Sequence, residues 1–268
     1  MKTITNLINP AFALFAFACF ALSRTAEATL NFADTAYGYS ALASEAGGNY
    51  NSAFGWGALA FNTIGTNNTG VGYGTLYYNL ASDNTAAGYA ALDHNTTGFS
   101  NTATGSFVLN GNIGGSYNTA NGYEALFNAE ANDNTATGAL ALYSDTSGYY
   151  NTATGVSSLF SNDTGYFNVA SGVSALYYNI GGHDNTATGY QALLHNAGAF
   201  NVGTGSNAGA NISSGNYNTA EGAYALFHTN TGSLNTGLGI NARSSLTTGN
   251  GTDQEYLPLR RVWPGSLR

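Results

Sequence analysis

The stretch Asn-Thr-Ala-Thr-Gly occupies residues 151–155 and is followed by Leu159, and the same phrase recurs at residues 185–189 with Leu193. Variants that open on Asn, or once on Asp, occur thirteen times along the chain at steps of 16 or 17 residues. Numbered from this opening residue, position 5 is Gly in all thirteen copies and position 9 is Leu in eleven. A fixed short period of this kind is typical of a stack of small, similar coils.

Alternation within the phrase predicts which side chains face the interior. Position 3 is only ever Ala or Gly, whereas position 4 accepts residues as different as Tyr37, Asn121 and Glu221. Successive side chains of a strand point to opposite faces, so position 3 should face inward and positions 2 and 4 outward. The Leu column then fills a narrow core, and the Gly at position 5 permits a tight corner.

We therefore predict an all-β chain, a parallel β-solenoid (β-roll) of about thirteen coils of 16–17 residues. A unit of this length fits two short strands and two turns. The opening Asn and a second Asn column at position 12, as in Asn62 and Asn162, are expected at turns. There Asn tolerates left-handed geometry and can stack its amide along the axis. A helical fold is excluded because Gly and Asn recur and no apolar period of 3.6 persists.

The N-terminal residues 1–28 have the pattern of a secretory signal peptide. Lys2 supplies a positive start, residues 11–22 form an apolar run too short to span a membrane, and Ala26–Ala28 is a small-x-small cleavage site. Cys19 is the only cysteine, so the mature chain is expected without disulfides. A lipoprotein anchored through Cys19 is the alternative. Either way the chain is predicted to be exported, to the extracellular space or the cell surface, with no membrane span once the signal is removed.

The mature chain divides into a repeat domain at residues 29–250 and a segment at 251–268 that we expect to be a terminal cap or a loose tail. A cap is expected because the last coil of a solenoid otherwise exposes an unpaired edge. The repeat domain carries one cation, Arg243, against eleven acidic residues. Nucleic acids and anionic membrane surfaces, which bind basic patches, are therefore not expected as partners.

Catalytic and metal-binding patterns are weak. His94, His195 and His228 share position 11, but no two lie in adjacent coils. His195 and His228 should be about 10 Å apart by strand spacing, too far to share a metal ion. The acidic residues form no calcium repeat, residues 70–74 are a Gly-x-Gly-x-Gly run that opens no helix, and no Ser-His-Asp grouping recurs. We predict no enzyme activity, no metal and no cofactor.

A column of threonines is the first candidate binding face. Four copies of the phrase carry Thr-x-Thr on the predicted outward side: Thr102 and Thr104, Thr135 and Thr137, Thr152 and Thr154, and Thr186 and Thr188. These pairs resemble the threonine arrays of solenoid ice-binding proteins, and the phrase is similar to the Asn-x-Val-x-Gly repeat of plant antifreeze solenoids. Alternatively, Thr is simply a good β-former on an exposed face.

An aromatic column at position 6 is the second candidate. It consists of Trp56, Tyr73, Tyr89, Tyr123 and Tyr190. These rings could pack across an interface between chains or form a stacking surface for sugars. Their shared position does not decide between the two.

The run Asn185–Gly198, read N-T-A-T-G-Y-Q-A-L-L-H-N-A-G, resembles the NTAxGxxAL repeats of bacterial surface and tail-fibre-type proteins. The run Gly205–Gly215, read G-S-N-A-G-A-N-I-S-S-G, resembles a motif that often closes such arrays. More distantly, the pattern is similar to the head β-rolls of trimeric autotransporter adhesins, in which three chains pack together. The resemblance implies an exported, non-catalytic structural or adhesive module that could be a homotrimer, with carbohydrate, protein or ice as ligand. An ice-binding protein using the outward Thr column is the alternative.

Overall fold

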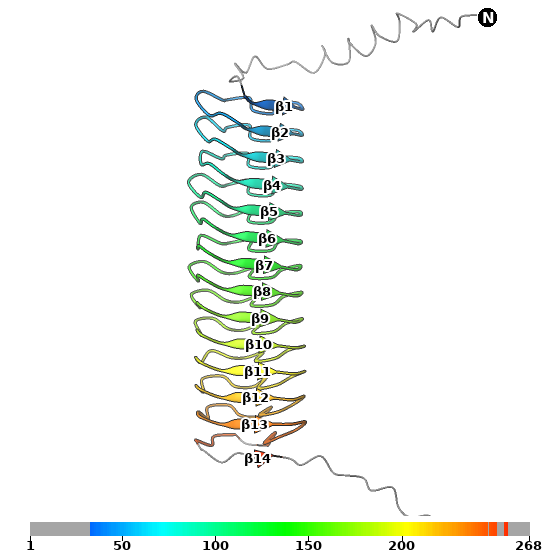
Figure 1. Cartoon of the computed structure of the whole chain (residues 1–268), viewed down its shortest axis with the longest axis vertical. Coiled ribbons are helices and arrows are strands. Elements are labelled where there is room, and N and C mark those ends of the chain that lie inside the picture. Colours follow the sequence, from blue (N-terminus) through cyan, green and yellow to red (C-terminus); the bar gives the residue numbers. More distant parts are fainter. Residues whose placement is uncertain (1–32, 246, 251–254, 257–268) are drawn as a thin grey trace, which may run out of the picture. The chain divides into compact units, whose positions relative to one another are not determined.

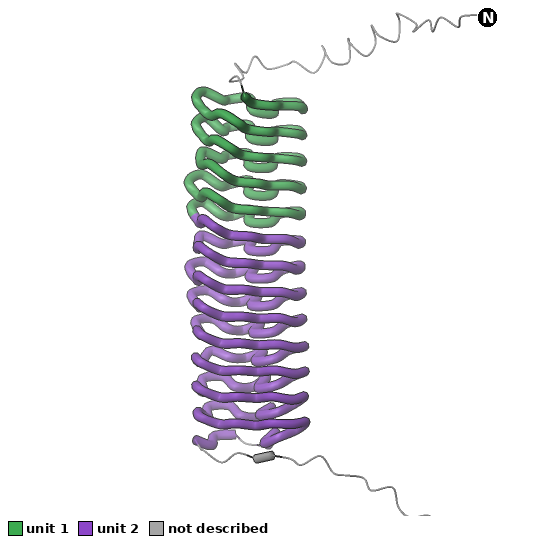
Figure 2. The backbone as a smooth tube through the Cα atoms, viewed as in Figure 1, with its two compact units in different colours: residues 1–114 green, residues 115–268 purple. Residues whose placement is uncertain are grey.

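The computed structural model describes residues 33–245, 247–250, and 255 and 256. The predicted signal peptide at 1–28 lies outside the described residues, as does the segment at 251–268 apart from Glu255–Tyr256. The chain divides into two compact units, unit 1 at residues 1–114 and unit 2 at residues 115–268 (Figure 2). Each unit is described by itself.

Both units are parallel β-solenoids with one three-residue strand in each coil (Figure 1). Unit 1 contains β1 (Thr35–Tyr37), β2 (Ser52–Phe54), β3 (Thr69–Val71), β4 (Thr85–Ala87) and β5 (Thr102–Thr104). Unit 2 contains β6 (Thr119–Asn121), β7 (Thr135–Thr137), β8 (Thr152–Thr154), β9 (Val169–Ser171), β10 (Thr186–Thr188), β11 (Val202–Thr204), β12 (Thr219–Glu221), β13 (Thr236–Leu238) and the two-residue β14 (Glu255–Tyr256). The predicted all-β solenoid is confirmed.

Within each unit every strand pairs in parallel with the next, and the repeat phrases lie in register. In β7 and β8, for example, Thr135 lies opposite Thr152 and Thr137 opposite Thr154. The central Ala or Gly is buried in β2 to β13, and in β5 to β10 the residues on either side of it are exposed. The predicted assignment of faces is therefore confirmed.

The other side of each coil is not a strand, so the expectation of two strands per coil is wrong. After the corner Gly, positions 7 and 9 adopt left-handed backbone geometry, as at Ser157 (φ 55°) and Leu159 (φ 50°). Left-handed residues cannot belong to an extended strand. The ladder between coils nevertheless continues, because the Leu159 N–H donates to the Ala175 carbonyl of the next coil at 2.9 Å.

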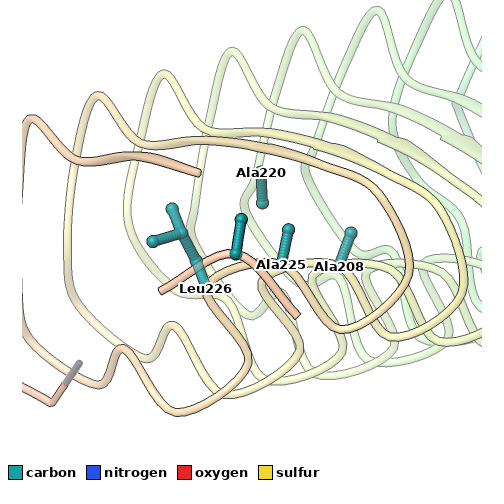
Figure 3. Packing of buried hydrophobic residues seen from close by; sticks show 5 residues of the cluster. Ala208, Ala220, Ala225 and Leu226 are labelled. Carbon is teal, nitrogen blue, oxygen red and sulfur yellow. The ribbon is translucent and has the colours of Figure 1, made fainter. Parts of the chain in front are cut away.

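The core of each coil is built from Leu at position 9 and small residues at positions 3 and 8. Figure 3 shows one such cluster in unit 2, where Ala208, Ala220, Ala225 and Leu226 pack together. Coil 11, which contains β11, carries Gly209 at position 9 and Ile212 at position 12. A Cβ on Gly209 would lie 2.9 Å from the Ile212 Cδ1 atom. The Ile212 side chain therefore takes up the space that Leu fills in other coils.

Two columns of buried asparagines link successive coils through their side chains. At position 12 of unit 2, Asn179 Nδ2 donates to Asn162 Oδ1 at 2.9 Å, and Asn196 Nδ2 donates to Asn179 Oδ1 at 3.2 Å. At position 1, the Asn168 N–H donates to Asn151 Oδ1 at 3.0 Å. The predicted amide stacking is confirmed. The predicted left-handed geometry is wrong for these columns, because the positive φ values fall at positions 5, 7 and 9 and at the last residue of the coil instead.

The corner at position 5 explains why only Gly occurs there. Gly155 has a φ of 128°, and a Cβ at this residue would lie 2.6 Å from the Gly172 carbonyl oxygen of the next coil. Both the backbone angle and the close approach of the neighbouring coil exclude a side chain.

Candidate functional site

The outward strand face of unit 2 brings together three of the four predicted Thr-x-Thr pairs. Thr135 and Thr137 lie on β7, Thr152 and Thr154 on β8, and all four side chains are exposed. Thr186 and Thr188 lie on β10, two strands beyond β8, with β9 between. Thr102 and Thr104 are exposed on β5 in unit 1 and belong to a different unit.

A longer hydroxyl row runs along position 4 of unit 2, and the search for Thr-x-Thr pairs missed it. The row crosses β7 to β11 in register and consists of Thr137, Thr154, Ser171, Thr188 and Thr204. All five side chains are exposed. Beside it, Val169 and Val202 interrupt the threonines at position 2, but Val has nearly the shape of Thr. Reading the position 4 column alone, with Ser counted as a hydroxyl, would have found this row.

The aromatic column is continuous only in unit 1. There Trp56 stacks on Tyr73 with ring centroids 4.5 Å apart, and Tyr73 stacks on Tyr89 at 5.1 Å. Tyr39, which the sequence analysis did not include, adds a fourth ring 6.5 Å from Trp56. Tyr123 and Tyr190 are half exposed in unit 2 and do not belong to this stack. A hydrogen bond to the Glu124 carboxylate raises the pKa of the Tyr123 phenol.

Parallel stacking determines what the unit 1 column can bind. The interplanar angles along Trp56, Tyr73 and Tyr89 are 9° and 7°, so each ring covers a face of its neighbour. Ring edges and phenol hydroxyls therefore point to solvent, whereas a sugar ring stacks on an open aromatic face. The stack is better suited to stabilising neighbouring coils or to edge-on packing than to lying flat under a sugar.

Unit 2 has aromatic stacks that the sequence analysis did not identify. At position 10, Phe127, Tyr143, Phe160 and Tyr177 form a half-buried series with centroid distances of 5.3, 5.2 and 4.9 Å. The signal was present in the sequence, as a large ring at position 10 of four successive coils. Position 10 is hard to recognise as an aromatic column because other coils carry Ala, Asp, Asn, Leu or Ser there.

A polar groove of about 680 Å³ lies along coils 10 to 13 of unit 2, the coils of β10 to β13. Its lining alternates between positions 11 and 13–14 and consists of His195, Asn211, His228 and Ser245 on one side and Ser213, Asn230, Thr247 and Thr248 on the other. The His195 ring stacks on Tyr178 of the preceding coil at 4.9 Å and 4°. The groove thus brings together two of the three position 11 histidines, while His94 belongs to unit 1.

Two acidic residues are buried in position 12 of their coils, where most coils have Asn. Burial raises the pKa of the Asp145 carboxyl to about 8, although Asn162 Nδ2 and the Gly148 N–H both donate to it. Burial, together with the nearby Asp34 carboxyl, raises the pKa of Glu45 to about 7. Asp145 accepts hydrogen bonds from the Asn162 amide and the Gly148 N–H, and Glu45 accepts one from Asn51 Nδ2, so we assign both acids a structural role.

Comparison with known proteins gives no match to a family model, to a curated protein or to a solved structure. Within residues 33–245, 247–250 and 255–256, no three His, Cys, Asp or Glu side chains gather closely enough to hold a metal ion. The same part of the chain contains no helix with the length and apolar character that a membrane crossing requires.

Proposed function

We propose that this chain is an exported, non-catalytic β-solenoid that serves as a structural or adhesive module at a cell surface or in a fibre. The observation that carries the proposal is the contrast between the two faces of each strand. Inward residues are uniform and buried, as at Ala136 and Ala153, whereas outward residues differ between coils, as at Asn121, Thr154 and Glu221. A scaffold of fixed spacing that displays varied side chains in register suits recognition of an extended surface.

A pull-down with the purified mature chain tests this proposal. We expect the chain to bind intact bacterial cells or insoluble cell-wall polysaccharide, and to show no hydrolysis of the material it binds. The family resemblance extends the proposal to a homotrimer, which sedimentation velocity measures directly. A chain that binds none of these surfaces, or that releases soluble sugars from them, would contradict the proposal.

Ice binding is a second candidate because of the hydroxyl row on β7 to β11. An ice-binding face needs a regular array that orders water across several coils at once. The row from Thr137 to Thr204 supplies five exposed hydroxyl residues on successive strands in register. In unit 1 the same position carries Tyr37, Phe54 and Val71, so the array is confined to part of the chain.

The two candidates are separated by a double substitution in the row. If the row binds ice, Thr137→Tyr with Thr154→Tyr abolishes thermal hysteresis without unfolding the protein. Ser147→Tyr with Thr164→Tyr is the matched control, because these exposed residues lie in the same coils but away from the strands. Absence of thermal hysteresis in the unmodified chain excludes the ice-binding role and leaves the adhesive one.

A further inference from the structure

The groove on coils 10 to 13 of unit 2 has a lining of one chemical kind. Its eight residues contribute two imidazoles, two carboxamides and four hydroxyls, and none of them is Asp, Glu, Lys or Arg. Each of these groups can both donate and accept hydrogen bonds. A ligand rich in hydroxyl groups, which also donate and accept, matches such a lining better than an ion does.

The exposed His195 ring supplies hydrogen-bonding nitrogen atoms to the groove. One face of the imidazole is covered by Tyr178, which lies parallel to it in the preceding coil. The opposite face looks along the column toward coil 11, where Asn211 stands in place of a ring. The coil spacing of about 4.8 Å leaves no room for a sugar between this face and Asn211, so the His195 ring presents its exposed edge, with its nitrogen atoms, to the groove.

Asn211 lies between the two histidines of the groove wall. Among the described residues its carboxamide has no hydrogen-bond partner, whereas Ser213 across the groove donates to the Asn230 carbonyl at 3.1 Å. The imidazoles of His195 and His228 are two coils apart, about 10 Å by strand spacing. This span leaves room for one or two pyranose rings above the Asn211 amide. The volume of about 680 Å³ also falls in the range of small-molecule sites, roughly 300–1,000 Å³.

We infer that this groove binds a neutral saccharide, whose hydroxyl groups hydrogen-bond to the Asn211 amide and to the imidazoles of His195 and His228. The inference rests on the adhesive function proposed above and names its ligand class. An anionic ligand fits poorly because the lining holds no permanent cation and the chain has a formal net charge of −8. A metal ion fits poorly because the two imidazoles are too far apart to ligate one ion. Because the groove is open and polar, the affinity of a single site should be weak. Many copies of the chain on one surface would raise the overall affinity.

The test uses histidine NMR signals of the full chain, which contains only four histidines. Cellobiose, N,N′-diacetylchitobiose and mannobiose are the neutral probes, with glucuronic acid and Zn²⁺ as the charged ones. We expect at least one neutral disaccharide to shift the Hε1 signals of His195 and His228 and to leave those of His94 and His183 in place. A response to Zn²⁺ or glucuronic acid alone overturns the inference.

A pair of substitutions locates the site. Asn211→Leu replaces the central amide with an apolar side chain of similar size that cannot hydrogen-bond, so it should weaken disaccharide binding at least about tenfold. Asn128→Leu is the matched control, because Asn128 occupies position 11 of coil 6, is exposed and lies outside the groove. Equal binding by both variants overturns the groove assignment.

Failure of the inference and failure of the proposed function are distinguishable. If the chain still adheres to cells while Asn211→Leu has no effect on that adhesion, the groove assignment falls and the adhesive role stands. If the unmodified chain binds neither cells nor polysaccharide, the proposed adhesive role itself is refuted.

Discussion

Substitution of Leu159 tests both the core and the unusual backbone of the turn side. Leu159 is fully buried in unit 2, has a φ of 50° and donates its N–H to the Ala175 carbonyl at 2.9 Å. Its side chain therefore stabilises the core while its backbone is in a conformation that costs a residue with a Cβ roughly 1–2 kcal/mol. Two variants, Leu159→Ala and Leu159→Gly, separate these contributions.

The magnitudes follow from what each variant removes. Leu159→Ala removes three carbon atoms, which at about 0.8 kcal/mol each is about 2.4 kcal/mol of lost burial. The cavity adds to this, so the total cost should be about 3–4 kcal/mol. Leu159→Gly removes one more methyl group, about 0.8 kcal/mol, but relieves about 1 kcal/mol of left-handed strain. The two variants should therefore differ by less than about 0.5 kcal/mol, although Gly is normally the more damaging replacement.

Urea unfolding followed by circular dichroism measures the total cost, and hydrogen exchange shows whether loss of protection is confined to the coils around Leu159. Exchange is needed because repeat proteins can unfold locally, so a single free energy of unfolding is not guaranteed. Thr154→Ala, on the exposed face of the same coil, is the control and should change stability by less than about 0.5 kcal/mol. A Gly variant less stable than the Ala variant by well over 1 kcal/mol would refute the left-handed strain at position 9. Equal costs at Leu159 and Thr154 would show that the faces are reversed.

Three further predictions concern positions of fixed geometry in the unit 2 coils, two of them buried and one at the corner. Asn179→Ala removes the Nδ2 donor that lies 2.9 Å from the buried Asn162 Oδ1. The free energy of unfolding, measured with urea, should fall by about 1–3 kcal/mol for each group left unpaired. Gly155→Ala places a Cβ 2.6 Å from the Gly172 carbonyl oxygen at a φ of 128° and should cost more than about 3 kcal/mol, seen as a lowered Tm. Burial raises the folded-state pKa of Asp145 from its ordinary value of 3.8 to about 8, so the stabilising effect of this carboxyl is complete below about pH 4 and is lost as pH rises toward 8. Asp145→Asn should remove that slope, at most about 1.4 kcal/mol per pH unit, and an unchanged slope would refute the assignment.

The strand side of the fold could be predicted from sequence because its signal has a period of two. Position 3 never exceeds Ala in size, and the structure buries that residue completely at Ala136 and Ala153. The Leu column was equally readable, since only a buried apolar site requires the same large residue in nearly every coil. In both cases one physical constraint, burial, acts on every copy of the repeat.

The turn side could not be predicted because the residue types there do not indicate which residues have positive φ. Positive φ is usually inferred from Gly or Asn, yet here Leu159 and Ser157 adopt it. Hydrogen bonds between coils and burial of the Leu side chain outweigh the local preference of each residue. The groove was missed for a similar reason, because positions 11 and 13–14 meet only through this turn geometry.

The buried acids also follow from the direction of the Asn column at position 12. Each amide in the column donates to the preceding coil, as Asn162 does to Asp145 and Asn179 does to Asn162. The first residue of such a series has no acceptor behind it, and position 12 of coil 6 is Ala129, which offers no side-chain oxygen. An Asn at residue 145 would therefore direct its N–H toward Ala129, whereas Asp145 presents a second oxygen that Asn134 Nδ2 reaches at 3.0 Å. The acid thus satisfies the start of a directional series of amides, and burial raises its pKa even though the hydrogen bonds from Asn162 and Gly148 act in the opposite direction.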